Sequence, residues 1–132
     1  MDKKETMYRI NQVVDMNGER KRYEQTVNAE VLERKDRYLR YTEQLDDYEI
    51  DVVMRVGDDF IKIQRRGIIN MNFHFQQGET TDTFYESPAG KHHFRINTTA
   101  LDIGEVTIEI RYELYDHNGK LGDYHYKIRK VG

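Results

Sequence analysis

A carboxylate and a guanidinium are the side chains best suited to chemistry in this sequence, because both fall among apolar residues. The alternation that turns Leu39 and Tyr41 inward also turns Glu43 inward, and in the run 60–65 Arg65 shares a face with two isoleucines. A lone buried charge costs several kcal/mol, so the two groups should find each other or reach water. Three interpretations stay open: solvated strand ends, a structural ion pair, and a pair that contacts a ligand.

Four tyrosines fall in the same inward phase, and each brings a large apolar body with one hydroxyl that needs a partner. His92 shares this phase. With Val, Ile, Met, Phe, one Glu and one Arg around them, they have the composition of a small-molecule site, but equally that of a filled barrel core. The sequence leaves cavity and filled core open. The predicted ligand-binding residues are Tyr41, Glu43, Arg65, Tyr85, His92 and Tyr112, and Tyr126 completes the inward tyrosines.

Several classes of chemistry are disfavoured by what the sequence lacks. Cysteine is absent, which removes disulfides, thiolate catalysis and zinc–thiolate sites. His92 and His93 are neighbours on a predicted strand and point to opposite faces, so they cannot chelate one metal ion together. The only serine, Ser87, lies beside Pro88 in a turn, which disfavours serine hydrolase chemistry. We therefore predict no catalytic residue, no metal and no cofactor.

The charge distribution and the absence of long apolar segments limit the classes of partner and the location that we expect. Twenty-one Lys and Arg stand against twenty-four Asp and Glu, interspersed in sign, so the concentrated basic face that nucleic acids require is not expected. The charged stretch 1–6 is followed by no apolar run of signal-peptide length, and no segment is long enough to cross a membrane as a helix. We expect a cytoplasmic monomer or weak homodimer, with residues 1–6 disordered.

The dominant hydrophobic period is two, which is typical of strands with one buried face. Asn17-Gly18 and Asn118-Gly119 are pairs favoured in tight hairpins where both central residues need positive φ. One short non-strand element is predicted from Thr98 to Gly104, between a cap-type residue and a terminating glycine. Apolar residues alternate in the segments 23–31, 39–41, 50–56, 61–63, 71–75, 94–96, 106–114 and 124–128.

Length and pattern together predict the fold class. The 132 residues suit one domain, and ten Tyr with five Phe are too many for a disordered chain. Eight to ten antiparallel strands, each with one apolar face, must stack as two sheets or close on themselves. Long strands joined mainly by hairpins favour an all-β, up-and-down antiparallel barrel over a Greek-key sandwich, with residues 1–132 as a single domain.

Groups of residues in a fixed order resemble the YwiB-like family of bacterial proteins. They are Tyr38 to Glu43; Arg65-Arg66-Gly67 before Met71 and Phe73; Tyr85 to Gly90 before Phe94, Ile96 and Thr98; and Tyr112-Glu113-Leu114 before an Asn-Gly turn. The resemblance spans residues 9–131 and rests on order and spacing rather than on one motif. It implies a calycin-type barrel similar to lipocalins, in a stand-alone cytoplasmic protein of a family with no established activity. The family's recurrent positions map to Tyr41, Glu43, Arg65, Gly67, Tyr85, Gly90, Thr98 and Tyr112.

Three functions compete. The first is a non-catalytic barrel whose interior binds a small, partly apolar, anionic molecule, with Arg65 holding the anion and Glu43 neutralising Arg65 when the site is empty. The second is a small-barrel enzyme with Glu43 as general base, which a neighbouring Arg65 opposes because opposite charge favours the ionised carboxylate. The third is an interaction module that uses strand edges or the outer face for a protein partner.

Overall fold

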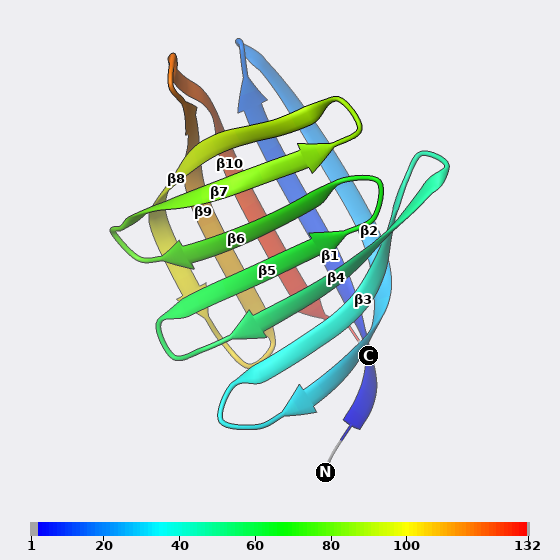
Figure 1. The fold of residues 1–132 in the computed structure, drawn as a ribbon. Helices are drawn as coiled ribbons and strands as arrows, with labels where there is room; N and C mark the ends of the chain where they lie inside the picture. The colour runs from blue at the N-terminus through cyan, green and yellow to red at the C-terminus, as the bar shows by residue number, and fades with distance from the viewer. Residues whose placement is uncertain (1–2, 132) are drawn as a thin grey trace.

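Ten strands, antiparallel throughout, close into a barrel in this computed structural model, which describes residues 3–131. Each strand pairs with the next along the chain, and the first pairs with the last (Figure 1). The predicted all-β, up-and-down barrel of eight to ten strands is confirmed in this form. The strands are β1 (Lys3–Met16), β2 (Glu19–Glu33), β3 (Arg37–Leu45), β4 (Tyr48–Val56), β5 (Phe60–Arg66), β6 (Asn70–Gln76), β7 (Thr80–Ser87), β8 (Gly90–Ile103), β9 (Thr107–Asp116) and β10 (Gly119–Lys130).

The core lies inside the barrel because the predicted alternation places one apolar set per strand there. In β4, Ile50, Val52, Met54 and Val56 are all buried, while the residues between them are not. Aromatic rings from non-adjacent strands also meet in the core, where Phe75 of β6 contacts Tyr112 of β9 at a ring-centroid distance of 4.8 Å. Within the described residues no helix is long and apolar enough to cross a membrane.

The two Asn-Gly hairpins form where they were predicted. Asn17 and Gly18 have φ of 54° and 77°, so both central residues adopt the left-handed conformation that joins β1 to β2. The β9–β10 hairpin is built differently: of its Asn-Gly pair only Gly119 has positive φ, and the Asn118 amide donates to the Asp116 carboxylate at 2.8 Å. The side chain of Asp116 therefore supplies part of the second turn.

The prediction of a non-strand element from Thr98 to Gly104 is wrong. Strand β8 continues to Ile103 and pairs with β9, with a register shift between Thr98 and Ala100. The prediction rested on a cap-type threonine and a terminating glycine, but the strand accommodates the extra residue as a bulge. Gly104 does mark the turn into β9, where its amide bonds to the Thr107 carbonyl at 2.9 Å.

The prediction that residues 1–6 are disordered is also wrong for the part that the structure describes. Strand β1 starts at Lys3, and its first residues pair with the end of β2, for example Glu5 with Glu30. A charged segment can still extend a ladder, because backbone groups make the hydrogen bonds and side chains of an outer strand face can stay in water. Residues 1–2 lie outside the described residues.

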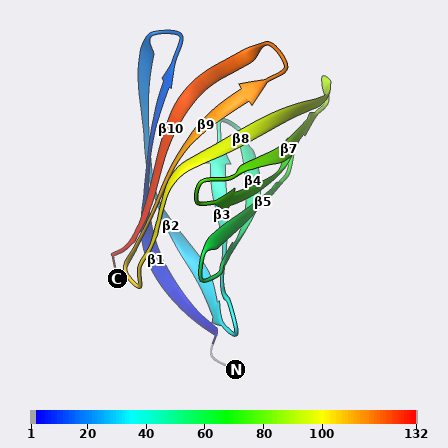
Figure 2. The same ribbon diagram turned by 90° about the vertical axis from the view of Figure 1, so that its left-hand side faces the viewer.

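Two seams interrupt the otherwise continuous ladder. Strands β2 and β3 pair only where Glu30–Glu33 meets Arg37–Arg40, and β6 and β7 pair only at two positions. Strands β2 and β3 have no ladder pairs between Glu30–Arg40 and the mouth, and Figure 2 shows the hairpins splaying apart at one end of the barrel. At the β6–β7 seam, the hydroxyls of Thr81 and Thr83 donate to the carbonyls of His74 and Asn72 in place of backbone amides.

Candidate functional site at the barrel mouth

The connectivity brings the predicted site residues to one end of the barrel. Because the strands follow one another up and down, the five hairpins β1–β2, β3–β4, β5–β6, β7–β8 and β9–β10 all lie at that end, which we call the mouth (Figure 1). Glu43, Arg65 and Tyr85 come late in odd-numbered strands, and His92 comes early in an even-numbered one. All four therefore lie near the mouth, although they are far apart in the sequence.

The strand register shows which of the predicted residues lie in the core and which lie on the rim. One row of cross-strand neighbours begins in the core and ends in solvent: Tyr41, Val52, Arg65, Met71, Tyr85 and His92. The β7–β8 hairpin runs past the last pair between β8 and β9, so His92 has a neighbour on one side only and is exposed, and Tyr85 is half-buried. Neither residue lines the cavity beside Arg65 described below. His92 was predicted to point inward, but it lies on the rim.

Glu43 and Arg65 do face each other inside the mouth. The Arg65 Nε lies 3.2 Å from the Glu43 Oε1, and their side chains are 22% and 11% exposed. The Nε is buried but has no hydrogen-bond partner, so this contact is an ion pair without a well-directed hydrogen bond. Gln25 of β2 donates to the other carboxylate oxygen of Glu43 at 3.2 Å. The Glu43 carboxylate is therefore contacted from two sides.

Buried tyrosines surround this pair. The hydroxyls of Tyr41 and Tyr126 hydrogen-bond at 3.0 Å. Burial raises the pKa of Tyr126 to about 12, and burial also raises the pKa of Tyr41 and of Tyr112. Burial lowers the pKa of Arg65, but Glu43 and the nearby tyrosines outweigh that effect and raise it. The phenols are therefore neutral and the guanidinium charged throughout the physiological pH range.

Alkaline pH should destabilise the barrel through these phenols. Tyr126 has a pKa of about 12 against an ordinary value of 10.0, so folding favours the protonated form. This contribution is complete below pH ~10 and is lost as the pH rises toward 12, which amounts to about 1.4 kcal/mol by pH 11 for Tyr126 alone. Urea unfolding at pH 8 to pH 11 measures it. Tyr126→Phe should reduce the pH dependence, and an unchanged slope in this variant would exclude Tyr126 as its source.

Arg65 also lines a cavity of about 390 Å³ at the mouth. The rest of the wall comes mainly from the β1–β2 hairpin, with Tyr124 of β10 completing it. This wall mixes apolar and aromatic side chains with one further cation and one carboxylate. Its lining residues are Gln12, Val14, Met16, Asn17, Glu19, Lys21, Tyr23, Arg65 and Tyr124. Except for Arg65, none of them was among the predicted site residues.

Below the mouth, buried side chains pack the barrel interior. A void of about 10 Å³ lies between the Arg65 side chain and the rings of Phe73, Phe75, Tyr112 and Tyr126, and it has room for one water molecule at most. Tyr112 is stacked on Tyr124 at a ring-centroid distance of 4.9 Å, which links the filled core to the cavity wall. Over residues 3–131, His, Asp and Glu side chains form no group of three suited to a metal ion.

A closed barrel of ten consecutive antiparallel strands, with an arginine–glutamate pair inside one end, defines a small β-barrel protein. Residues 9–128 match the model of a family described as Domain of unknown function (DUF1934). The chain belongs to this family, which confirms the resemblance seen in the sequence.

Two solved structures are similar to the chain. The YwiB protein from Bacillus subtilis is 21% identical, with 98% of this chain and 96% of that chain covered and a TM-score of 0.72. At this identity the likeness shows the fold alone. The LolA superfamily protein NE2245 from Nitrosomonas europaea is 8% identical, with 100% and 88% covered and a TM-score of 0.34. No curated protein matches the sequence.

Proposed function

We propose that the protein binds a small, partly apolar, anionic molecule at the barrel mouth without catalysis, as calycin-type barrels bind ligands at or below their open end. One observation carries this proposal. Arg65 lines the mouth cavity, its guanidinium is ion-paired with Glu43, and its buried Nε has no hydrogen-bond partner among the described residues. A guanidinium with unused donors in a partly desolvated wall suits a carboxylate, sulfonate or phosphate group.

The remaining wall suits the apolar part of such a ligand. Val14, Met16 and the rings of Tyr23 and Tyr124 supply apolar surface around Arg65. Lys21 adds a second positive charge at the same cavity. Small-molecule sites commonly combine an apolar wall with a few polar groups that fix orientation. The cavity therefore favours an amphipathic anion over a fully polar one.

Glu43 acts in this proposal as a counterion and not as a general base. Its carboxylate is contacted by Arg65 on one oxygen and by Gln25 on the other. An ionised carboxylate of this kind balances the guanidinium when no ligand is bound. The Glu43 carboxylate would also repel an arriving anion and so lower the affinity of the site for it.

Removing the guanidinium should weaken anion binding by about tenfold or more, the range expected for one charge-assisted hydrogen-bonded contact. One probe is anilinonaphthalene sulfonate, whose binding is measured by fluorescence. The other is decanoate, whose binding is measured by calorimetry and compared with that of its neutral analogue decanol. Arg65→Met should lose affinity for the two anions and keep whatever affinity decanol shows. Arg66→Met is the matched control, because the adjacent Arg66 is exposed and points to the outer face. Equal affinities in all three proteins would contradict the proposal.

Neutralising the counterion should have the opposite effect. Glu43→Gln keeps the size and the possibility of a hydrogen bond with Gln25 but removes the charge that competes for Arg65. We expect affinity for the sulfonate probe to rise about three- to tenfold, because the ligand no longer approaches a fixed negative charge. Gln44→Glu, an added charge at the exposed neighbouring position, serves as the opposite control. A loss of affinity in Glu43→Gln would show that Glu43 helps to bind the probe.

A further inference from the structure

The β2–β3 seam leaves two strand edges facing each other. Strand β2 pairs with β1 along its length, and β3 pairs with β4 along its length, but the two pair with each other only from Glu30 and Arg40 onward. Residues 25–29 of β2 and 41–44 of β3 therefore have a strand neighbour on one side only. We call the space between these two edges the slit. Unpaired strand edges present rows of amide and carbonyl groups that can accept a further strand.

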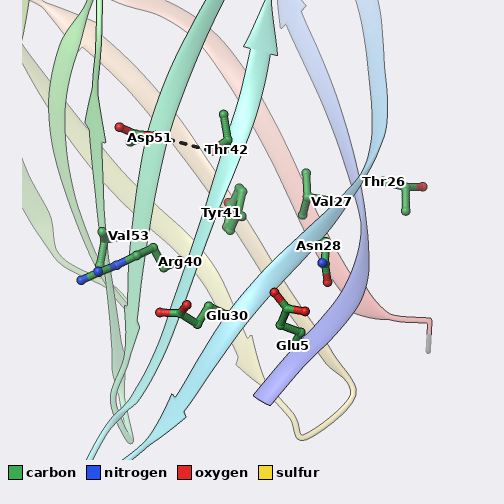
Figure 3. Close-up of a pocket in the computed structure, with 10 residues that line it drawn as sticks. All are labelled: Glu5, Thr26, Val27, Asn28, Glu30, Arg40, Tyr41, Thr42, Asp51 and Val53. Atoms are coloured by element: carbon green, nitrogen blue, oxygen red, sulfur yellow. Dashed lines mark hydrogen bonds between the residues drawn. The ribbon is translucent and has the colours of Figure 1, made fainter. Parts of the chain in front are cut away.

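A cavity of about 710 Å³ lies in the slit (Figure 3). Buried Val27 and Tyr41 form its floor, and they come from the two facing edges. Carboxylates gather at the rim, from Glu5 of β1, Glu30 of β2 and Asp51 of β4. Asp51 accepts a hydrogen bond from Thr42 at 3.4 Å, and Arg40 is the one cation among the lining residues.

We propose that the slit binds an extended peptide with alternating apolar and basic side chains, which adds as a strand between β2 and β3. The backbone groups of the two edges would supply the hydrogen bonds, as in other cases of strand addition. Alternate side chains of the inserted strand would point to the floor at Val27 and Tyr41 or out to the rim. The exposed carboxylates of Glu5 and Asp51 favour basic residues at the rim positions.

The ends of the slit limit the length of the peptide. The β2–β3 ladder closes one end at Glu30 and Arg40, and the Gln25–Glu43 hydrogen bond spans the other. Between these points β2 offers residues 25–29, so a strand of about five or six residues fits at the ordinary rise of ~3.3 Å per residue. Because β2 and β3 are antiparallel, an inserted strand runs parallel to one edge and antiparallel to the other.

A capped hexapeptide of alternating valine and lysine tests the proposal on the isotope-labelled full chain. We expect slower hydrogen exchange for amides in both 25–29 and 41–44 when the peptide is added. Its valine–glutamate counterpart should bind at least tenfold more weakly. The double variant Glu5→Gln, Asp51→Asn should bind the lysine peptide severalfold more weakly, and because both residues are exposed, its folding is not at risk.

Two N-methylated peptides give the sharpest control. Successive amides of a strand point to opposite neighbours, so methylating the odd or the even amides blocks one edge each. Insertion between both edges predicts that both methylated peptides lose at least tenfold in affinity. Loss with only one of them, no protection of either edge, or a doubled particle mass from pairing between two copies would overturn the proposal. The Arg65→Met variant should bind the peptide as the native chain does, which separates this test from that of the anion site.

Discussion

Phe75→Ala is expected to lower the free energy of unfolding by about 3 to 5 kcal/mol, the largest single effect among the side chains described. Phe75 is 2% exposed, and its ring packs between Phe73 at 5.6 Å and Tyr112 at 4.8 Å, measured between ring centroids. Truncation removes buried apolar surface and leaves a hole that a closed ladder of strands cannot collapse to fill. Urea-induced unfolding measures the loss.

The chain offers a matched control for Phe75 in Phe84. Phe84 is 46% exposed on the outer face of β7, where Lys91 lies over its ring at 4.8 Å. Phe84→Ala should cost less than about 1 kcal/mol, because the ring is already largely hydrated and its cation contact is exposed. If the two variants lost similar stability, the barrel interior would not be the packed core that the structure shows.

Two threonine-to-valine substitutions should change stability in opposite directions, with a difference of about 2 to 4 kcal/mol between them. Thr83 is buried at the β6–β7 seam, and its hydroxyl donates to the Asn72 carbonyl, so Thr83→Val leaves that carbonyl without its donor. Thr98 is equally buried, but its Oγ1 has no hydrogen-bond partner. Thr98→Val removes an unsatisfied polar atom and should stabilise the protein.

The opposite signs make this pair informative, because the chemical change is the same at both sites. The backbone bonds of Thr98 to Gly78 and Glu79, at 3.0 and 3.1 Å, do not involve its side chain and remain in the variant. Hydrogen exchange should also accelerate in β6 and β7 for Thr83→Val and not for Thr98→Val. Destabilisation of both variants to the same extent would mean that the hydroxyl of Thr83 does not hold the seam.

The fold and the inward placement of Glu43 and Arg65 could be predicted from sequence because both depend on the period of two. Each strand has one buried face, so apolar alternation shows where strands run and which side faces the core. The same phase placed Glu43 and Arg65 inside, and their ion pair is one of the three arrangements that the sequence left open. The up-and-down order followed from the short turns between long strands.

The cavity wall could not be predicted in this way. Gln12, Lys21 and Tyr124 also lie in the inward phase, but alternation does not show how far a hairpin extends beyond its neighbours. The same uncertainty misplaced His92, which shares the inward phase but lies where the β7–β8 hairpin has left the barrel. The bulge after Thr98 and the two seams depend on how neighbouring strands pair. The sequence of one strand does not show this pairing.

An even number of consecutive strands has a practical consequence for measurement. Strand β1 begins and strand β10 ends at the pole opposite the mouth, as Figure 1 shows. A tether attached beside either Lys4 or Lys130 would hold the molecule with its mouth pointing away from the support. Surface-based binding assays and single-molecule attachment can therefore use either terminus without obstructing the arginine that we expect to receive the ligand.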